Sequence, residues 1–139
     1  MSEQNVIEKA IEILSNYPGM SYKKLNDGEL KIIRSSENGF DIILQLDQIE
    51  NTLHFGNFHW HFDNNIEESN EMLNQLIFAL TGKARLKEFS KNGKAFKWKL
   101  EIQDSEGIWI DSMTTSSVNL NFWSKIRIKY LQNHPIGQH

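Results

Sequence analysis

The chain has 139 residues, of which 39% are hydrophobic and 24% charged, and it contains no cysteine. This length and composition are ordinary for one globular domain over residues 1–139, and they exclude disulfides, thiol catalysis and cysteine-ligated metal centres. No apolar run approaches the roughly 20 residues that a membrane-spanning helix needs. The first residues lack the pattern of a signal peptide, so the sequence predicts a cytoplasmic protein without a membrane segment.

Charge is divided unevenly along the chain. Residues 1–82 carry 5 Lys and Arg against 13 Asp and Glu, a balance of −8, whereas residues 83–139 carry 10 against 5, a balance of +5. Such asymmetry indicates a basic face for an acidic partner or an acidic face for a basic one. The sequence therefore predicts a protein partner and leaves the oligomeric state open.

The first half of the chain changes from helical to strand periodicity. Apolar residues recur at helical spacing over residues 3–16, which predicts a first helix. Alternating apolar and polar residues then predict strands at 30–32 and 40–47, joined as one hairpin, and a second hairpin over 52–63. A second helix is expected over residues 65–81, where an asparagine stands at the capping position.

The pattern of the second half of the chain predicts strands. The Asn92-Gly93 turn predicts a hairpin between residues 84–89 and 96–102, with a bulge between Leu86 and Phe89. The other expected elements are a short strand at 108–111, a loop at 114–117 and a last strand at 120–130.

The order of elements predicts an α+β fold. Helix, four strands, helix and four strands suit a curved antiparallel sheet of about eight strands with two helices on one face. The other sheet face is then solvated or is a binding surface. A meander interrupted by one helix explains this order, and no side-chain repeat supports the alternative of a duplication.

The hairpin over residues 52–63 is rich in histidine. A two-residue turn at Gly56-Asn57 would place His54 opposite His59, with His61 one strand repeat away. The apolar side chains of this hairpin then share the opposite face: Leu53, Phe55, Phe58, Trp60 and Phe62.

Three imidazoles with an open position would suit zinc, copper or nickel, and a neutral imidazole would suit a general base near pH 7. The predicted metal ligands are His54, His59 and His61, for zinc or another divalent metal. A solvated face with incidental histidines, or a partner surface, explains the pattern as well. No distant fourth ligand stands out, so the sequence assigns no catalytic residue and no definite cofactor.

A basic sheet face is expected near the end of the chain. If the last three strands pair in order, their odd-numbered residues share one face: Lys97, Lys99, Glu101, Trp109, Asp111, Trp123, Lys125, Arg127 and Lys129. Six of them are predicted to bind a partner: Trp109, Trp123, Lys97, Lys99, Lys125 and Arg127. Rings among basic side chains suit a protein partner or a single-stranded nucleic acid. The isoelectric point of about 5.9 and the lack of an RNP-like motif count against nucleic acid, and a solvated face with Lys–Glu pairs is the plain alternative.

The segment Phe55-Gly-Asn-Phe-His-Trp-His-Phe-Asp63 resembles the aromatic His-x-His-Phe-Asp stretch of small uncharacterised bacterial domains of the polymorphic-toxin immunity type. The resemblance implies a cytoplasmic, non-enzymatic bacterial protein that binds and blocks one cognate toxin. An acidic N-terminal half would suit a basic nuclease as that toxin. A small metal-dependent enzyme and a single-stranded nucleic-acid binder are the alternatives.

Overall fold

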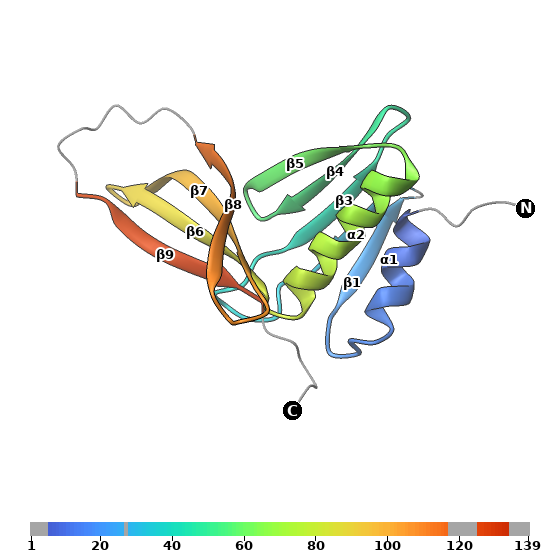
Figure 1. The fold of residues 1–139 in the computed structure, drawn as a ribbon, viewed down its shortest axis with the longest axis horizontal. Helices are drawn as coiled ribbons and strands as arrows, with labels where there is room; N and C mark the ends of the chain where they lie inside the picture. The colour runs from blue at the N-terminus through green and yellow to red at the C-terminus, as the bar shows by residue number, and fades with distance from the viewer. Residues whose placement is uncertain (1–5, 27, 117–124, 134–139) are drawn as a thin grey trace, which may run out of the picture.

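The computed structural model describes residues 6–26, 28–116 and 125–133. Within these residues, two helices, α1 (Val6–Leu14) and α2 (Ile66–Leu80), accompany nine strands in two antiparallel sheets (Figure 1). The first sheet follows chain order: β1 (Tyr22–Asn26), β2 (Glu29–Ile32), β3 (Ile42–Leu46), β4 (Glu50–Phe55) and β5 (Phe58–Asp63). The second sheet has the order β8-β7-β6-β9 and is built from β6 (Ala84–Lys91), β7 (Lys94–Gln103), β8 (Trp109–Ser116) and β9 (Arg127–Gln132).

The predicted α+β class with antiparallel strands is confirmed, while the strands are distributed differently. The described part of the chain forms nine strands in two sheets rather than about eight in one. Strand β1 was not expected, because all five of its residues are exposed and it therefore lacks an apolar alternation. The loop predicted at 114–117 is wrong as far as residue 116, because these residues continue β8 along β7.

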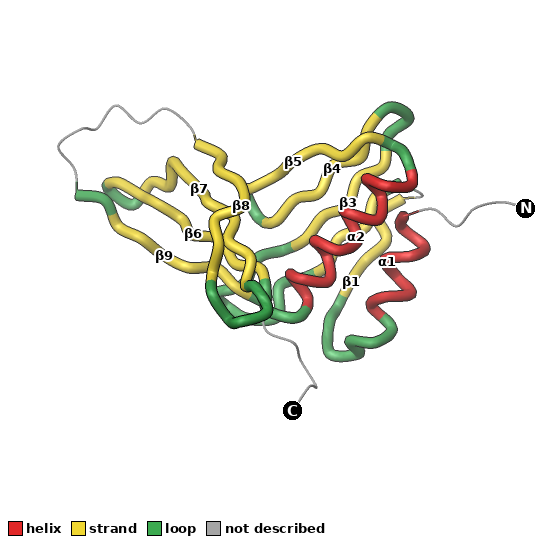
Figure 2. The backbone as a smooth tube through the Cα atoms, in the orientation of Figure 1, coloured by secondary structure: helices red, strands yellow, loops and turns green. Residues whose placement is uncertain are grey.

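The first sheet forms around rows of apolar side chains that cross its strands. Leu30, Leu44 and Leu53 are opposite one another on β2, β3 and β4, and all three are fully buried. Both helices cover this face, as Figure 2 shows in red. Each such leucine contributes roughly 2 kcal/mol by leaving water, so this layer holds most of the apolar core.

Helix α2 begins and ends with local capping. The side-chain oxygen of Asn65 accepts a hydrogen bond from the backbone N–H of Glu68 at 2.8 Å, which confirms the expected cap. At the other end Gly82 takes a φ of 75°, a left-handed conformation that favours glycine. Within the described residues no helix is long and apolar enough to span a membrane.

A buried amide fixes the second sheet to the first. The side chain of Asn133 is fully buried, donates to the carbonyl of Phe40 at 2.9 Å and accepts from its N–H at 3.0 Å. Gly39 makes room for it, because a Cβ at this position would collide with Asn133 Oδ1. Directly before it, Gln132 Nε2 donates to the carbonyl of Gly82 at 2.6 Å. The end of β9 is therefore anchored both to the loop before β3 and to the end of α2.

Candidate functional site

Aromatic and cationic side chains share one face of the second sheet. Residues that pair across antiparallel strands point to the same face, and alternate residues along a strand share it. The pairing of β6 with β7 and β9, and of β7 with β8, therefore defines what we call the Arg85 face. Its members are Arg85, Lys87, Phe89, Lys97, Lys99, Glu101, Gln103, Trp109, Asp111, Thr114, Ile128, Tyr130 and Gln132.

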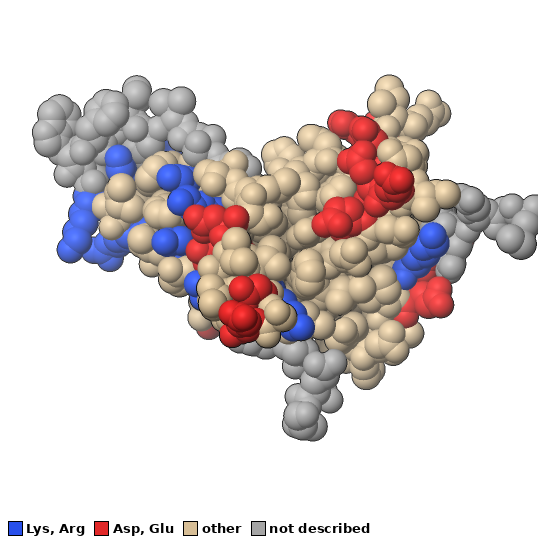
Figure 3. Space-filling model, in the orientation of Figure 1, with Lys and Arg blue, Asp and Glu red and all other residues tan. Residues whose placement is uncertain are grey.

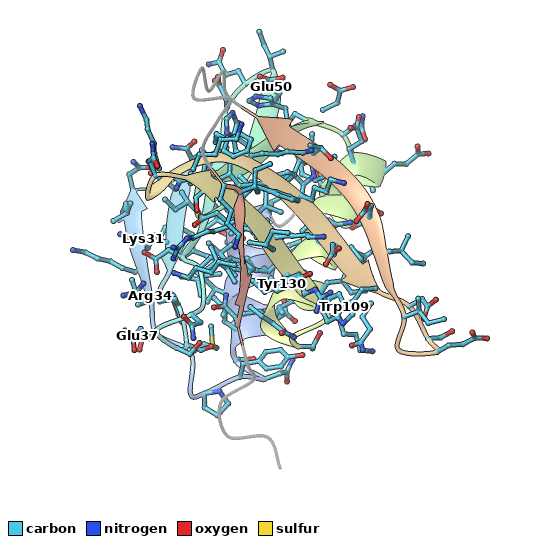
Figure 4. The ribbon with its side chains drawn as sticks, turned by 90° about the vertical axis from the view of Figure 1, so that its left-hand side faces the viewer. Lys31, Arg34, Glu37, Glu50, Trp109 and Tyr130 are labelled. Atoms are coloured by element: carbon cyan, nitrogen blue, oxygen red, sulfur yellow. The ribbon has the colours of Figure 1, made fainter. Side chains whose placement is uncertain are left out.

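Arg85 is at the centre of this face and contacts both outer strands. Its Cζ atom is 4.1 Å from the ring centroid of Trp109 on β8 and 4.3 Å from that of Tyr130 on β9. Figure 4, which looks onto the second sheet, labels both aromatic residues. The Nε of Arg85 also donates to Glu101 Oε1 at 2.7 Å, and the two side chains are only 21% and 10% exposed. One guanidinium thus joins all four strands through two cation–π contacts and one shielded ion pair.

We call Trp109, Arg85 and Tyr130 the Arg85 stack, and three lysines lie near it on the same face. The ammonium of Lys97 is 5.0 Å from the ring centroid of Phe89, and that of Lys87 is 5.4 Å from the same ring. The Nζ of Lys99 is 3.6 Å from Oδ2 of the exposed Asp111. Four cations therefore face two carboxylates, which leaves this face positively charged.

The predicted partner-binding residues divide between the two faces. Lys97, Lys99 and Trp109 share the Arg85 face, as expected. The expected pairing of β7 with β8 is confirmed, but the expected place of the last strand is wrong, because β9 pairs with β6. Arg127 is opposite Ser90 and Lys129 is opposite Glu88, which places both on the other face. Lys125 is exposed just before β9, and Trp123 lies outside the described residues.

Two central residues of this face were not predicted from the sequence. Arg85 and Tyr130 did not appear among the predicted partner-binding residues. The alternation of Arg85 and Lys87 around the buried Leu86 is a usable signal for an outward-facing pair. Tyr130 joins them only because β9 lies beside β6, and strand periodicity carries no information on that neighbour.

The histidine hairpin has the predicted register. His54 is opposite His59, Leu53 is opposite Trp60, and Gly56 takes the positive φ of 58° that its turn requires. The ring centroids of His54 and His59 are 5.4 Å apart, and those of His59 and His61 are 5.7 Å apart. The three imidazoles are therefore neighbours on the face that points away from the helices.

Two of these rings are already engaged with neighbouring side chains. His54 Nε2 is 2.7 Å from Gln45 Oε1, while His61 Nδ1 is 2.9 Å from Thr52 Oγ1 and 3.3 Å from Glu50 Oε1. Partial burial lowers the pKa of His54 and the neighbouring His59 lowers it further. In the described part of the chain no three His, Asp or Glu side chains are arranged to hold a metal ion. A metal role for the three histidines stays a prediction.

The charge asymmetry of the sequence is also an asymmetry in space. In Figure 3 the Lys and Arg side chains gather over the second sheet, and many Asp and Glu side chains gather near α2. Of the acidic residues, Glu67 and Glu68 belong to the first turn of α2, where the helix dipole favours negative charge. The second sheet is thus the more basic part of the surface, and the first turns of α2 are acidic.

Comparison with known proteins finds no match among family models, curated proteins or solved structures.

Proposed function

We propose that this chain is a non-enzymatic protein-binding domain that uses the Arg85 face. The observation that carries the proposal is the stack of Trp109, Arg85 and Tyr130, bordered by apolar side chains that remain exposed. Tyr130 is 44% exposed and Ile128, next to it on the same face, is 51% exposed. Interface centres are enriched in Trp, Tyr and Arg, and a ring already held in place loses little entropy on binding.

A protein explains this face better than a single-stranded nucleic acid. Bases would need free ring faces on which to stack, and Arg85 already covers one face of both Trp109 and Tyr130. The exposed Asp111 also places a carboxylate on this face, which disfavours a phosphate backbone. Polar groups held in fixed positions between rings are typical of a protein interface.

The finer form of the proposal is an immunity-like role. The resemblance of residues 55–63 to bacterial immunity domains supports a cognate toxin as the partner and the bacterial cytoplasm as the location. The partner surface that fits the Arg85 face carries carboxylates around an apolar centre, because the face itself is positive around its rings.

The experiment is affinity capture from the native host with a charge-reversed face. The tagged chain is compared with the Lys87→Glu/Lys97→Glu variant and with a matched control, Lys9→Glu/Lys23→Glu, which makes the same charge change on α1 and β1. We expect one protein to be enriched by the parent and the control, and to be recovered about tenfold less with the face variant, equivalent to about 1.4 kcal/mol.

Equal recovery by the face variant would contradict the proposal, as would the absence of any enriched protein with the parent chain. Unfolding curves of both variants exclude misfolding as the cause of a loss.

A further inference from the structure

A groove lies where the edges of the two sheets approach α2. Strand β5 is the last strand of the first sheet and β8 is the first of the second, so each has an edge without a partner among the described strands of its own sheet. Figure 1 shows β5 beside α2 and β8 on the side of the second sheet that is nearer to the first, and Figure 3 shows the surface hollowed between the two sheets. A cavity of about 300 Å³ occupies this position, which we call the inter-sheet groove. Its lining includes the aromatic Trp60, the acidic Glu68 and Glu71, the polar Gln75, the apolar Met113 and the titratable His61.

The groove combines a rigid aromatic wall with two carboxylates. The indole of Trp60 packs edge-on against Phe55, with centroids 5.0 Å apart and planes at 87°, and this contact fixes its orientation. Glu68 and Glu71 line the cavity from successive turns of α2, and among the described residues that line it His61 is the only basic side chain. Guanidinium groups bind sites of this kind, since the planar cation stacks on an indole and donates to carboxylates.

A second observation concerns hydrogen bonding rather than charge. Gln75 Nε2 donates to Glu71 Oε1 at 3.0 Å, but the Gln75 Oε1 atom is buried without a donor in the structure. The Gln75 oxygen therefore adds an unpaired acceptor beside the two carboxylates. An arginine side chain brings five N–H donors and no acceptor, which is the complement of these acceptors.

The edge of β5 offers backbone groups that could bind the segment carrying such a side chain. In a hairpin with a two-residue turn, Phe55 and Phe58 exchange backbone hydrogen bonds, and the bonding pairs then alternate along the ladder. The backbone N–H and C=O groups of His59 and His61 consequently point away from β4, towards the open edge. An extended segment can pair with such an edge and place alternate side chains in adjacent pockets.

We propose that the inter-sheet groove receives an arginine side chain from an extended segment of a partner protein. This surface is separate from the Arg85 face, on the opposite side of the second sheet, so either proposal can fail without the other. The carboxylates of Glu68 and Glu71 bind the guanidinium, and its methylene stem packs on Trp60 and Met113.

The test is an NMR titration of the full chain with the capped tripeptide acetyl-Val-Arg-Val-amide. We expect saturable shifts of the Trp60 indole N–H and the Gln75 side-chain amide, with a dissociation constant on the order of 1 mM. The same peptide with citrulline, a neutral isostere of arginine, produces no saturable shift. The lysine peptide binds more weakly, because an ammonium lacks the planar fork.

Matched variants on α2 separate the groove from general acidity. Glu68→Gln/Glu71→Gln weakens binding at least about fivefold, whereas Glu67→Gln, an exposed carboxylate outside the groove lining, leaves it unchanged. Unfolding curves confirm that the variants fold. The proposal is overturned if the shifts fail to appear at about ten times the expected dissociation constant. It is equally overturned if the citrulline peptide binds as well, or if Glu67→Gln weakens binding as much as the double variant.

Discussion

The first and second sheets are held together by different kinds of interaction. In the first sheet, rows of aliphatic and aromatic side chains are fully buried beneath two helices. In the second sheet, only Ala84, Leu86 and Leu100 are buried apolar residues among those described. Its strands are joined instead by the Arg85 stack and by polar contacts such as the bond from Trp98 Nε1 to Glu88 Oε2 at 2.8 Å. Apolar burial is non-directional, whereas polar contacts depend on geometry and lose most of their value when one partner is removed.

The largest expected effect is in the first sheet. Phe55→Ala removes a fully buried ring that contacts both Phe40 and Trp60, and we expect the free energy of unfolding to fall by about 4 kcal/mol. Chemical denaturation measures this change. Ile49→Ala is the control, because this side chain is 83% exposed and its removal should cost less than about 0.5 kcal/mol. Similar losses in the two variants would contradict an apolar origin for the stability of this sheet.

The second sheet is expected to respond to the loss of one cation. Arg85→Ala leaves the carboxylate of Glu101 shielded from water without its partner and removes both ring contacts, so the free energy of unfolding should fall by about 3 kcal/mol. Hydrogen exchange should increase in β6–β9 and change little in β2–β5.

Lys99→Ala provides the matched control on the same face. Its partner Asp111 is 60% exposed, so the loss should stay below about 1 kcal/mol. If Lys99→Ala were as damaging as Arg85→Ala, net charge rather than the stack would explain the effect.

The joint between the sheets should show an intermediate effect with a clear coupling. Asn133→Ala removes two buried hydrogen bonds to Phe40 and should cost about 2 kcal/mol. Gly39→Ala should also destabilise the protein, because the new Cβ collides with Asn133 Oδ1. In the Asn133→Ala background the Gly39→Ala change should cost less, and a double-mutant cycle from denaturation curves measures this coupling. Additive losses would show that the two residues act independently.

The smallest expected effect is the pH dependence contributed by His54. Because burial lowers its pKa, the folded state binds fewer protons than the unfolded state just below the ordinary value of 6.5. This contribution to stability is present above that value and is lost as the pH falls towards the lowered pKa. His54→Gln should therefore flatten the fall in unfolding free energy between about pH 8 and about pH 5. An unchanged slope would exclude His54 as its source.

Local chemistry accounts for what could be predicted from the sequence. The Gly56-Asn57 turn joins strands that are adjacent in the chain, so it fixed the pairing of His54 with His59 and the buried face of that hairpin. The Asn92-Gly93 turn likewise forms as expected, with both residues at positive φ. The predicted bulge in this hairpin occurs between Phe89 and Ser90, just beyond the expected interval.

Distant pairing accounts for what could not be predicted. Alternation shows which residues of a strand share a face, but it does not show which strand lies beside it. The position of β9 next to β6 could therefore not be predicted. For the same reason, neither the contact of Tyr130 with Arg85 nor the location of Arg127 on the other face could be predicted. The exposed strand β1 had no apolar pattern to reveal it.

The pairing of β6 with β9 also has a consequence for folding kinetics. Every strand pair in the first sheet joins sequence neighbours, so its hairpins close short loops and are expected to form early. Strands β6 and β9 are separated in the sequence by β7 and β8. Their pairing therefore closes a longer loop than any hairpin of the first sheet does. We expect the docking of β9, together with the insertion of the Asn133 amide beside Phe40, to be the last and slowest event on the pathway.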